Sequence, residues 1–144
     1  MNITIRPYQN IDLNDLLAVW ERATKLAHPF LTAPFLEQER HNIPNIYLPI
    51  ADTWVAVDKS NVIGFIALIG NEVGAIFVDP GYHGHGAGKA LMDKAQSLHS
   101  TLELDVFKEN QIGRRFYDRY GFKLQSEKTH EDTGNKILRL LYNT

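Results

Sequence analysis

The feature that most limits how this chain can fold is a glycine-rich segment in its middle. The segment reads DPGYHGHGAGKALM over residues 79–92, with glycines at positions 81, 84, 86 and 88. The apolar stretch AIFV (75–78) precedes it, and a helical pattern follows it. Glycine in a helix costs about 1 kcal/mol relative to alanine, so these residues have another purpose. A strand, a glycine-rich turn and a helix N-terminus in this order typically bind phosphate, because free N–H groups and the helix dipole face the anion.

Two common phosphate-binding motifs do not match this segment. The P-loop pattern G-x-x-x-x-G-K-[ST] fails because His83 replaces its first glycine and Ala90 replaces its hydroxyl residue. The dinucleotide pattern G-x-G-x-x-G fails because residues 84–88 read G-x-G-x-G. Asp105 resembles the ribose-binding acid of that fold, but residues 106–144 are too few to complete a doubly wound sheet.

The rest of the sequence alternates between short strand patterns and amphipathic helices. Strands are predicted at 2–7, 53–58, 62–70, 72–78, 101–107, 122–129 and 136–142, and helices at 12–27, 34–43, 87–100 and 110–120. Asn10 or Asp12, Thr32 or Ala33, and Asn110 are the expected helix starts, and Gly121 is an expected helix stop. This order predicts an α+β fold layered α/β/α, with a mixed, mostly antiparallel sheet of six or seven strands and helices on both faces. We expect a single domain over residues 1–144.

Composition excludes several classes of function. A formal net charge of −2 gives no basic surface, which argues against nucleic acid as a partner. The chain has no cysteine, which excludes disulfides, thiolate zinc sites and cysteine nucleophiles. Its six histidines show neither H-E-x-x-H nor H-x-x-E-H spacing, so we expect no metal. No apolar run approaches the length of a membrane span, and we expect a cytoplasmic protein without membrane association.

Four segments together resemble the GNAT superfamily of N-acetyltransferases. The signature of that family, [RQ]-x-x-G-x-[GA], corresponds to HGHGAG at 83–88. Residues 5–20 are similar to the first strand and helix of the family, residues 54–68 to its second and third strands, and residues 104–122 to its N-x-x-[AG]-x-x-F-Y-x-x-x-G-F segment. The chain departs from the family at His83, where arginine or glutamine is usual, and at Gly113, where alanine is common. We expect weaker or pH-dependent phosphate binding from the first change and a looser helix start from the second.

The resemblance implies that acetyl-CoA donates an acetyl group to a primary amine, which is a lysine side chain, a peptide N-terminus or a small-molecule amine. Its pyrophosphate would bind the loop formed by His83, Gly84, His85, Gly86, Ala87, Gly88 and Lys89. Its pantetheine arm would lie along Ile76, Phe77 and Val78 and would bind Asn110, which also suits a plain helix cap. The fourth and fifth strands of this family separate to form the reaction slot. A non-catalytic acetyl-CoA-binding module is the alternative function, and the protein is expected to be a monomer or a homodimer.

Tyr117 matches the general-acid tyrosine of the family, which protonates the leaving thiolate, although it could also be a core aromatic residue beside Phe116. The base that deprotonates the amine has two candidates. Asp105 shares one face of its strand with Glu103, and His28 belongs to the loop that borders the acceptor slot. HPFLTAPF (28–35), Tyr47, Trp54 and HEDTGN (130–135) are expected to shape the acceptor pocket. Small bacterial family members with an H-P-F-[LI] segment resemble lysine or peptide acetyltransferases.

Overall fold

The first half of the chain builds four antiparallel strands. In the computed structural model, which describes residues 2–144, these are β1 (Thr4–Pro7), β2 (Asp52–Asp58), β3 (Asn61–Ile69) and β4 (Glu72–Val78). Two-residue turns connect β2 to β3 and β3 to β4. Residues 62–68 of β3 are all buried, because helices cover both faces of the sheet there.

The second half adds β5 (Thr101–Phe107), β6 (Lys123–Thr129) and β7 (Lys136–Asn143). The sheet order is β1-β2-β3-β4-β5-β7-β6, and β4 with β5 is the parallel pair. The predicted fold class is therefore confirmed, with seven strands in a mixed, mostly antiparallel sheet.

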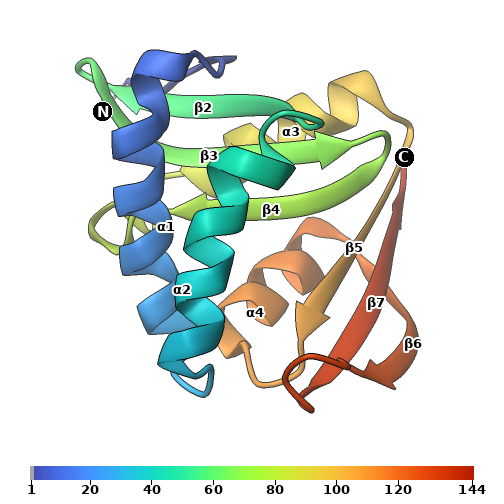
Figure 1. The fold of residues 1–144 in the computed structure, drawn as a ribbon. Helices are drawn as coiled ribbons and strands as arrows, with labels where there is room; N and C mark the ends of the chain where they lie inside the picture. Colours follow the sequence, from blue (N-terminus) through green and yellow to red (C-terminus); the bar gives the residue numbers. More distant parts are fainter. Residues whose placement is uncertain (1) are drawn as a thin grey trace.

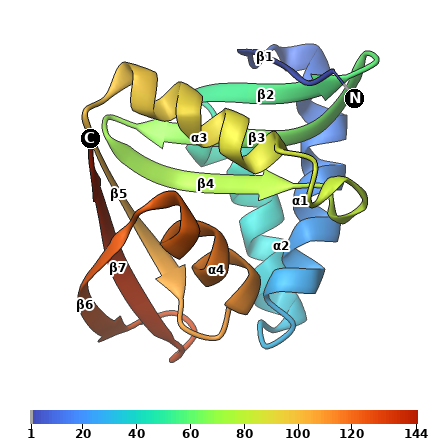
Figure 2. The same cartoon turned by 180° about the vertical axis from the view of Figure 1, so that it is seen from behind.

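Two helices lie on each face of this sheet. Helices α1 (Leu13–Ala27) and α2 (Ala33–Asn42) lie on one face (Figure 1), and α3 (Ala87–Leu98) and α4 (Gln111–Tyr120) lie on the other (Figure 2). The apolar stripe of α1 packs on Val55 and Phe65, and that of α3 packs on Ile63 and Ile66. No helix within residues 2–144 has the length and hydropathy of a membrane span. The cytoplasmic location stays a prediction.

The helix ends agree with the predicted caps, except at the start of α1. The Thr32 hydroxyl accepts the Phe35 N–H at the start of α2, and Gly121 takes a left-handed conformation (φ +119°) at the end of α4. Asp12 precedes α1 as expected but does not cap it with its side chain. Its carboxylate instead accepts the Gln9 N–H and pairs with the Arg6 guanidinium. A π-helical turn at Ile43–Tyr47 follows α2, and the sequence did not predict it.

The parallel strands β4 and β5 separate soon after they begin. Their one paired position is Glu72 with Glu103, and the strands diverge from there (Figure 1). We call this Glu72–Glu103 pairing the β4–β5 joint. Arg139 of β7 stabilises the joint, because its guanidinium donates to both carboxylate oxygens of Glu72, at 2.7 and 2.5 Å. Gly74 is left out of the pairing of β3 with β4 and forms a bulge just beyond the joint. The edge of β4 from Ala75 to Val78 therefore faces an open slot rather than a neighbouring strand.

Candidate active site

Two clefts meet where β4 and β5 separate. The first, the α2-side cleft, has a volume of about 310 Å³ and is walled by α1, α2, the π-helical turn, β4 and β5. The second, the glycine-loop cleft, has a volume of about 830 Å³ and is walled by the end of β4, the loop at 82–89 and α4. The residues that line both clefts are Ile76, Phe77, Asn110 and Tyr117. A long molecule in one cleft can therefore meet a second molecule in the other at these residues.

The glycine-loop cleft has the properties of an anion site. Gly86 precedes α3 with φ +86°, and a side chain there would meet no atom within 4 Å, so the helix start is open. The N–H groups of Ala87, Gly88 and Lys89 lie in the first helical turn, where no helical acceptor exists. Of the residues predicted to bind the donor, all but His85 line this cleft. Their roles in binding stay predictions.

The His83 side chain is turned away from an anion-binding role. Its Nε2 lies 3.0 Å from the carbonyl oxygen of Val78, so Nε2 carries the proton and donates it to the strand end. This contact occupies the Nε2–H group of the ring. The loop therefore offers an anion its backbone rather than this imidazole.

Tyr117 stands at the junction of the two clefts. It is the one buried residue of α4, and it packs against Phe116 and Phe122. Both clefts reach this side chain. Burial raises the pKa of Tyr117 above the ordinary tyrosine value, so the phenol holds its proton at neutral pH. Among the four shared residues it alone has an ionisable side chain.

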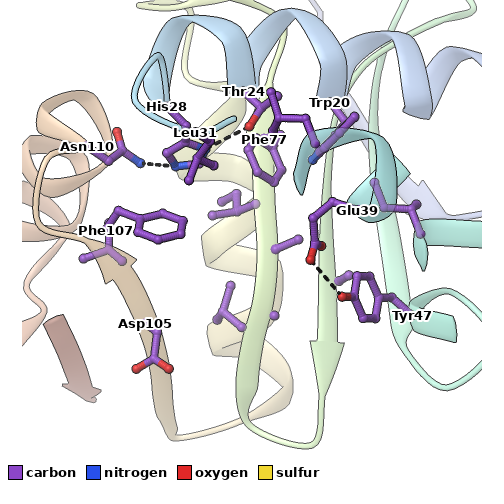
Figure 3. A pocket seen from close by; sticks show the side chains of 18 of the residues that line it. Trp20, Thr24, His28, Leu31, Glu39, Tyr47, Phe77, Asp105, Phe107 and Asn110 are labelled. Carbon is purple, nitrogen blue, oxygen red and sulfur yellow. Dashed lines mark hydrogen bonds between the residues drawn. The ribbon is translucent and has the colours of Figure 1, made fainter. Parts of the chain in front are cut away.

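A buried chain of hydrogen bonds fixes the state of His28 (Figure 3). The Asn110 Oδ1 accepts the Gly113 N–H at 2.9 Å, so its Nδ2 faces Nε2 of His28 at 3.2 Å. An amide nitrogen only donates, so Nε2 accepts and Nδ1 donates to the Thr24 hydroxyl at 2.8 Å. Burial lowers the pKa of His28 to about 4. His28 is thus neutral, with both ring nitrogens engaged, and its role as a base stays a prediction.

Gly113 has a different effect from the looser helix that the sequence indicates. A Cβ atom at this position would lie 2.6 Å from Nδ2 of Asn110. The missing side chain leaves space for the Asn110 amide to cap α4 and reach His28 at the same time. Gly113 therefore supports this hydrogen-bond chain.

The other predicted residues divide between the clefts. Asp105 lines the α2-side cleft, but its oxygens lie 3.3 Å from the Arg139 guanidinium and 3.8 Å from the Lys128 ammonium. Tyr47 and His130 line the same cleft, and their role in an acceptor pocket stays a prediction. Trp54 was wrongly placed there, because its ring packs into the core on the α3 side, with the Lys94 ammonium 4.1 Å from the ring centroid.

Glu39 is a residue of the α2-side cleft that the sequence analysis missed. It is half-buried, and its carboxylate accepts the Tyr47 hydroxyl at 3.2 Å (Figure 3). Glu39 follows Leu36 by three positions and Phe35 by four, so it lies on the apolar stripe of α2. A charged residue at an apolar position of this helix was the sequence feature that could have indicated its role in the cleft.

Comparison with known proteins decides the family. An acetyltransferase (GNAT) domain model matches residues 49–124. Peptidyl-lysine N-acetyltransferase YjaB of Salmonella typhimurium is 33% identical, over 99% of both chains. The chain belongs to the GNAT family of N-acetyltransferases. The solution structure of apo YjaB from Escherichia coli matches this GNAT chain with a TM-score of 0.88 and 30% identity, over 99% of this chain and 98% of that one.

A PaiA N-acetyltransferase of Thermoplasma acidophilum, solved in complex with coenzyme A, shares the fold of this GNAT chain. Its TM-score is 0.78 at 22% identity, over 99% of this chain and all of that one. The protein is thus an acetyltransferase rather than a non-catalytic module, and GNAT enzymes take their acetyl group from acetyl-CoA. The backbone N–H groups in the first turn of α3 and the unpaired edge of β4 fit such a donor. Within residues 2–144 no three His, Asp or Glu side chains could share a metal ion.

Proposed function

We propose that this enzyme transfers the acetyl group of acetyl-CoA to the ε-amino group of a lysine in a protein or peptide, with Tyr117 as the general acid. The observation that carries the proposal is the meeting of two clefts at a single ionisable side chain. The donor would enter from the glycine-loop cleft and the acceptor from the α2-side cleft.

The donor fits the larger cleft by shape and charge. The amides at residues 87–89 and the dipole of α3 favour the pyrophosphate. The open edge of β4 at residues 75–78 offers backbone groups to the amides of the pantetheine arm, as a neighbouring strand would. Bound in this way, the donor would bring its thioester near the four residues that line both clefts.

Tyr117 would then act on the leaving group. The neutral amine attacks the thioester carbonyl carbon, a C–N bond forms, and the C–S bond breaks. The sulfur takes the phenolic proton of Tyr117, and the phenolate regains a proton from the new amide nitrogen. Burial keeps the phenol protonated until the thiolate develops, and it also disfavours a free thiolate.

The acceptor side favours a lysine side chain. Leu31, Phe35, Leu36, Phe77 and Phe107 form apolar walls of the α2-side cleft. Such walls suit the four-methylene stem of lysine, which buries well while its charged end seeks a polar group. The name of the Salmonella relative, a peptidyl-lysine N-acetyltransferase, supports the same acceptor.

The test is acetyl transfer to a set of matched acceptors. We expect a peptide with one lysine and a blocked N-terminus to gain one acetyl group, located on the lysine by mass spectrometry, with equal release of thiol. A lysine-free peptide with a free N-terminus and a small polyamine serve as competing acceptors. Modification of either of these in preference to the lysine peptide would contradict the proposal.

A further inference from the structure

Glu39 occupies an unusual electrostatic position. Its half-buried carboxylate reaches the α2-side cleft from α2, and its contact in the structure is the Tyr47 hydroxyl (Figure 3). In the described part of the chain it forms no ion pair, and no lysine or arginine lines this cleft. A partly desolvated carboxylate without a cation is costly. The cleft is therefore prepared for a cation that arrives with the substrate.

The groups around Glu39 change the pKa of its carboxylate, but none of them forms an ion pair with it. Tyr47, on the π-helical turn, donates its hydroxyl to Glu39, and the charges of His130 and Asp132, in the turn between β6 and β7, also act on it. Burial raises the pKa of Glu39 above the ordinary glutamate value, Asp132 adds to this rise, and Tyr47 and His130 oppose it. A raised pKa makes the carboxylate a better proton acceptor than a solvated glutamate.

The two base candidates from the sequence are engaged elsewhere. His28 uses its Nε2 lone pair to accept from Asn110. Asp105 lies within ion-pair distance of Arg139 and Lys128. Glu39 is the carboxylate of this cleft that has no cation beside it within residues 2–144.

We propose that Glu39 is a catalytic residue that binds the acceptor's ammonium in the α2-side cleft and takes its proton before attack. This inference rests on the proposed function. The ammonium N–H bond breaks, its proton moves to a Glu39 oxygen, and the electron pair left on nitrogen attacks the thioester carbon. Glu39 later releases the proton to solvent, while the second nitrogen proton reaches the sulfur through Tyr117, so protons and charge balance.

The experiment compares Glu39→Gln with Glu37→Gln, an exposed position on the same helix that lines neither cleft. The probe is the single-lysine peptide, with kcat/KM measured from about pH 6.5 to pH 9.5. Without the base, attack requires a lysine amine that is already neutral. The neutral fraction of this amine rises tenfold per pH unit at pH values below its pKa of about 10.4. We expect Glu39→Gln to lose about 10²–10³-fold in kcat/KM near pH 7 and less than about 20-fold near pH 9.5. Glu37→Gln should follow the wild type.

Glu39→Asp provides the conservative control, and it should restore part of the wild-type pH profile because it restores a carboxylate. Acetyl-CoA affinity should be unchanged in all variants and no variant should unfold at a lower temperature than the wild type, which separates a lost base from a damaged fold. Glu39→Gln should unfold at an equal or higher temperature, because it removes a partly desolvated charge. A Glu39→Gln profile parallel to the wild type at every pH would overturn this inference and leave lysine acetylation standing. A wild type that does not modify lysine would overturn both.

Discussion

His28 lies between α1 and α4, where burial keeps its ring neutral and hydrogen bonds with Asn110 and Thr24 fix its tautomer. Its pKa is about 4 in the folded protein and about 6.5 when unfolded. As the pH falls below 6.5, the unfolded chain therefore binds a proton that the folded protein still refuses. Acidification therefore lowers the free energy of unfolding. The loss from His28 can reach about 3 kcal/mol, because its pKa differs by about 2.5 between the two states and each pKa unit corresponds to ~1.36 kcal/mol.

We predict that this loss is visible in urea unfolding between about pH 7 and pH 4. His28→Gln keeps a polar side chain but removes the titrating ring, and the carboxylates that also titrate in this range are common to both proteins. The free energy of unfolding should fall more steeply with acid in the wild type than in the variant. Parallel curves would mean that His28 is not held neutral.

At the scale of elements, the glycine loop and the start of α3 form the donor site. Gly86→Val should disturb the first-turn amides, because φ is +86° there and a branched side chain disfavours this conformation by about 1–2 kcal/mol. Gly70→Val is the matched control, since Gly70 also has a positive φ (+59°) and open space, and lies in the turn at the other end of β4. Both variants should lose similar stability, but only Gly86→Val should weaken acetyl-CoA binding, by at least about tenfold in calorimetry. Equal affinities would contradict the loop assignment.

The elements also show which features a sequence can reveal. The stop at Gly121 and the caps at Thr32 and Asn110 depend on residues within four positions, so their local patterns predicted them. The contact of Asn110 with His28 joins residues 82 positions apart, and no local pattern describes it. The role of Gly113 depends on that contact and was missed for the same reason.

At the scale of the whole molecule, the enzyme consists of two sheet halves held at one joint. The β4–β5 pairing at Glu72 and the Arg139 ion pairs fasten this joint, and the space beyond it becomes the two clefts. The resemblance to GNAT proteins predicted the separation of these strands, and strand periodicity predicted the elements. The cation-free position of Glu39 could not be predicted, because it depends on where the π-helical turn and the β6–β7 turn place their side chains.

The meeting of both clefts at Tyr117 is the central claim, and Tyr117→Phe tests it most directly. The change removes one oxygen, so packing and acetyl-CoA affinity should be preserved; Tyr8→Phe, at a tyrosine that lines neither cleft, is the control. We predict that kcat and kcat/KM for the lysine peptide both fall by about 10²–10⁴-fold in Tyr117→Phe, because the proton transfer matters only in the transition state. The deficit should shrink with a thioester whose thiol is more acidic, and Tyr8→Phe should match the wild type. A Tyr117→Phe enzyme with wild-type kcat on acetyl-CoA would contradict the account.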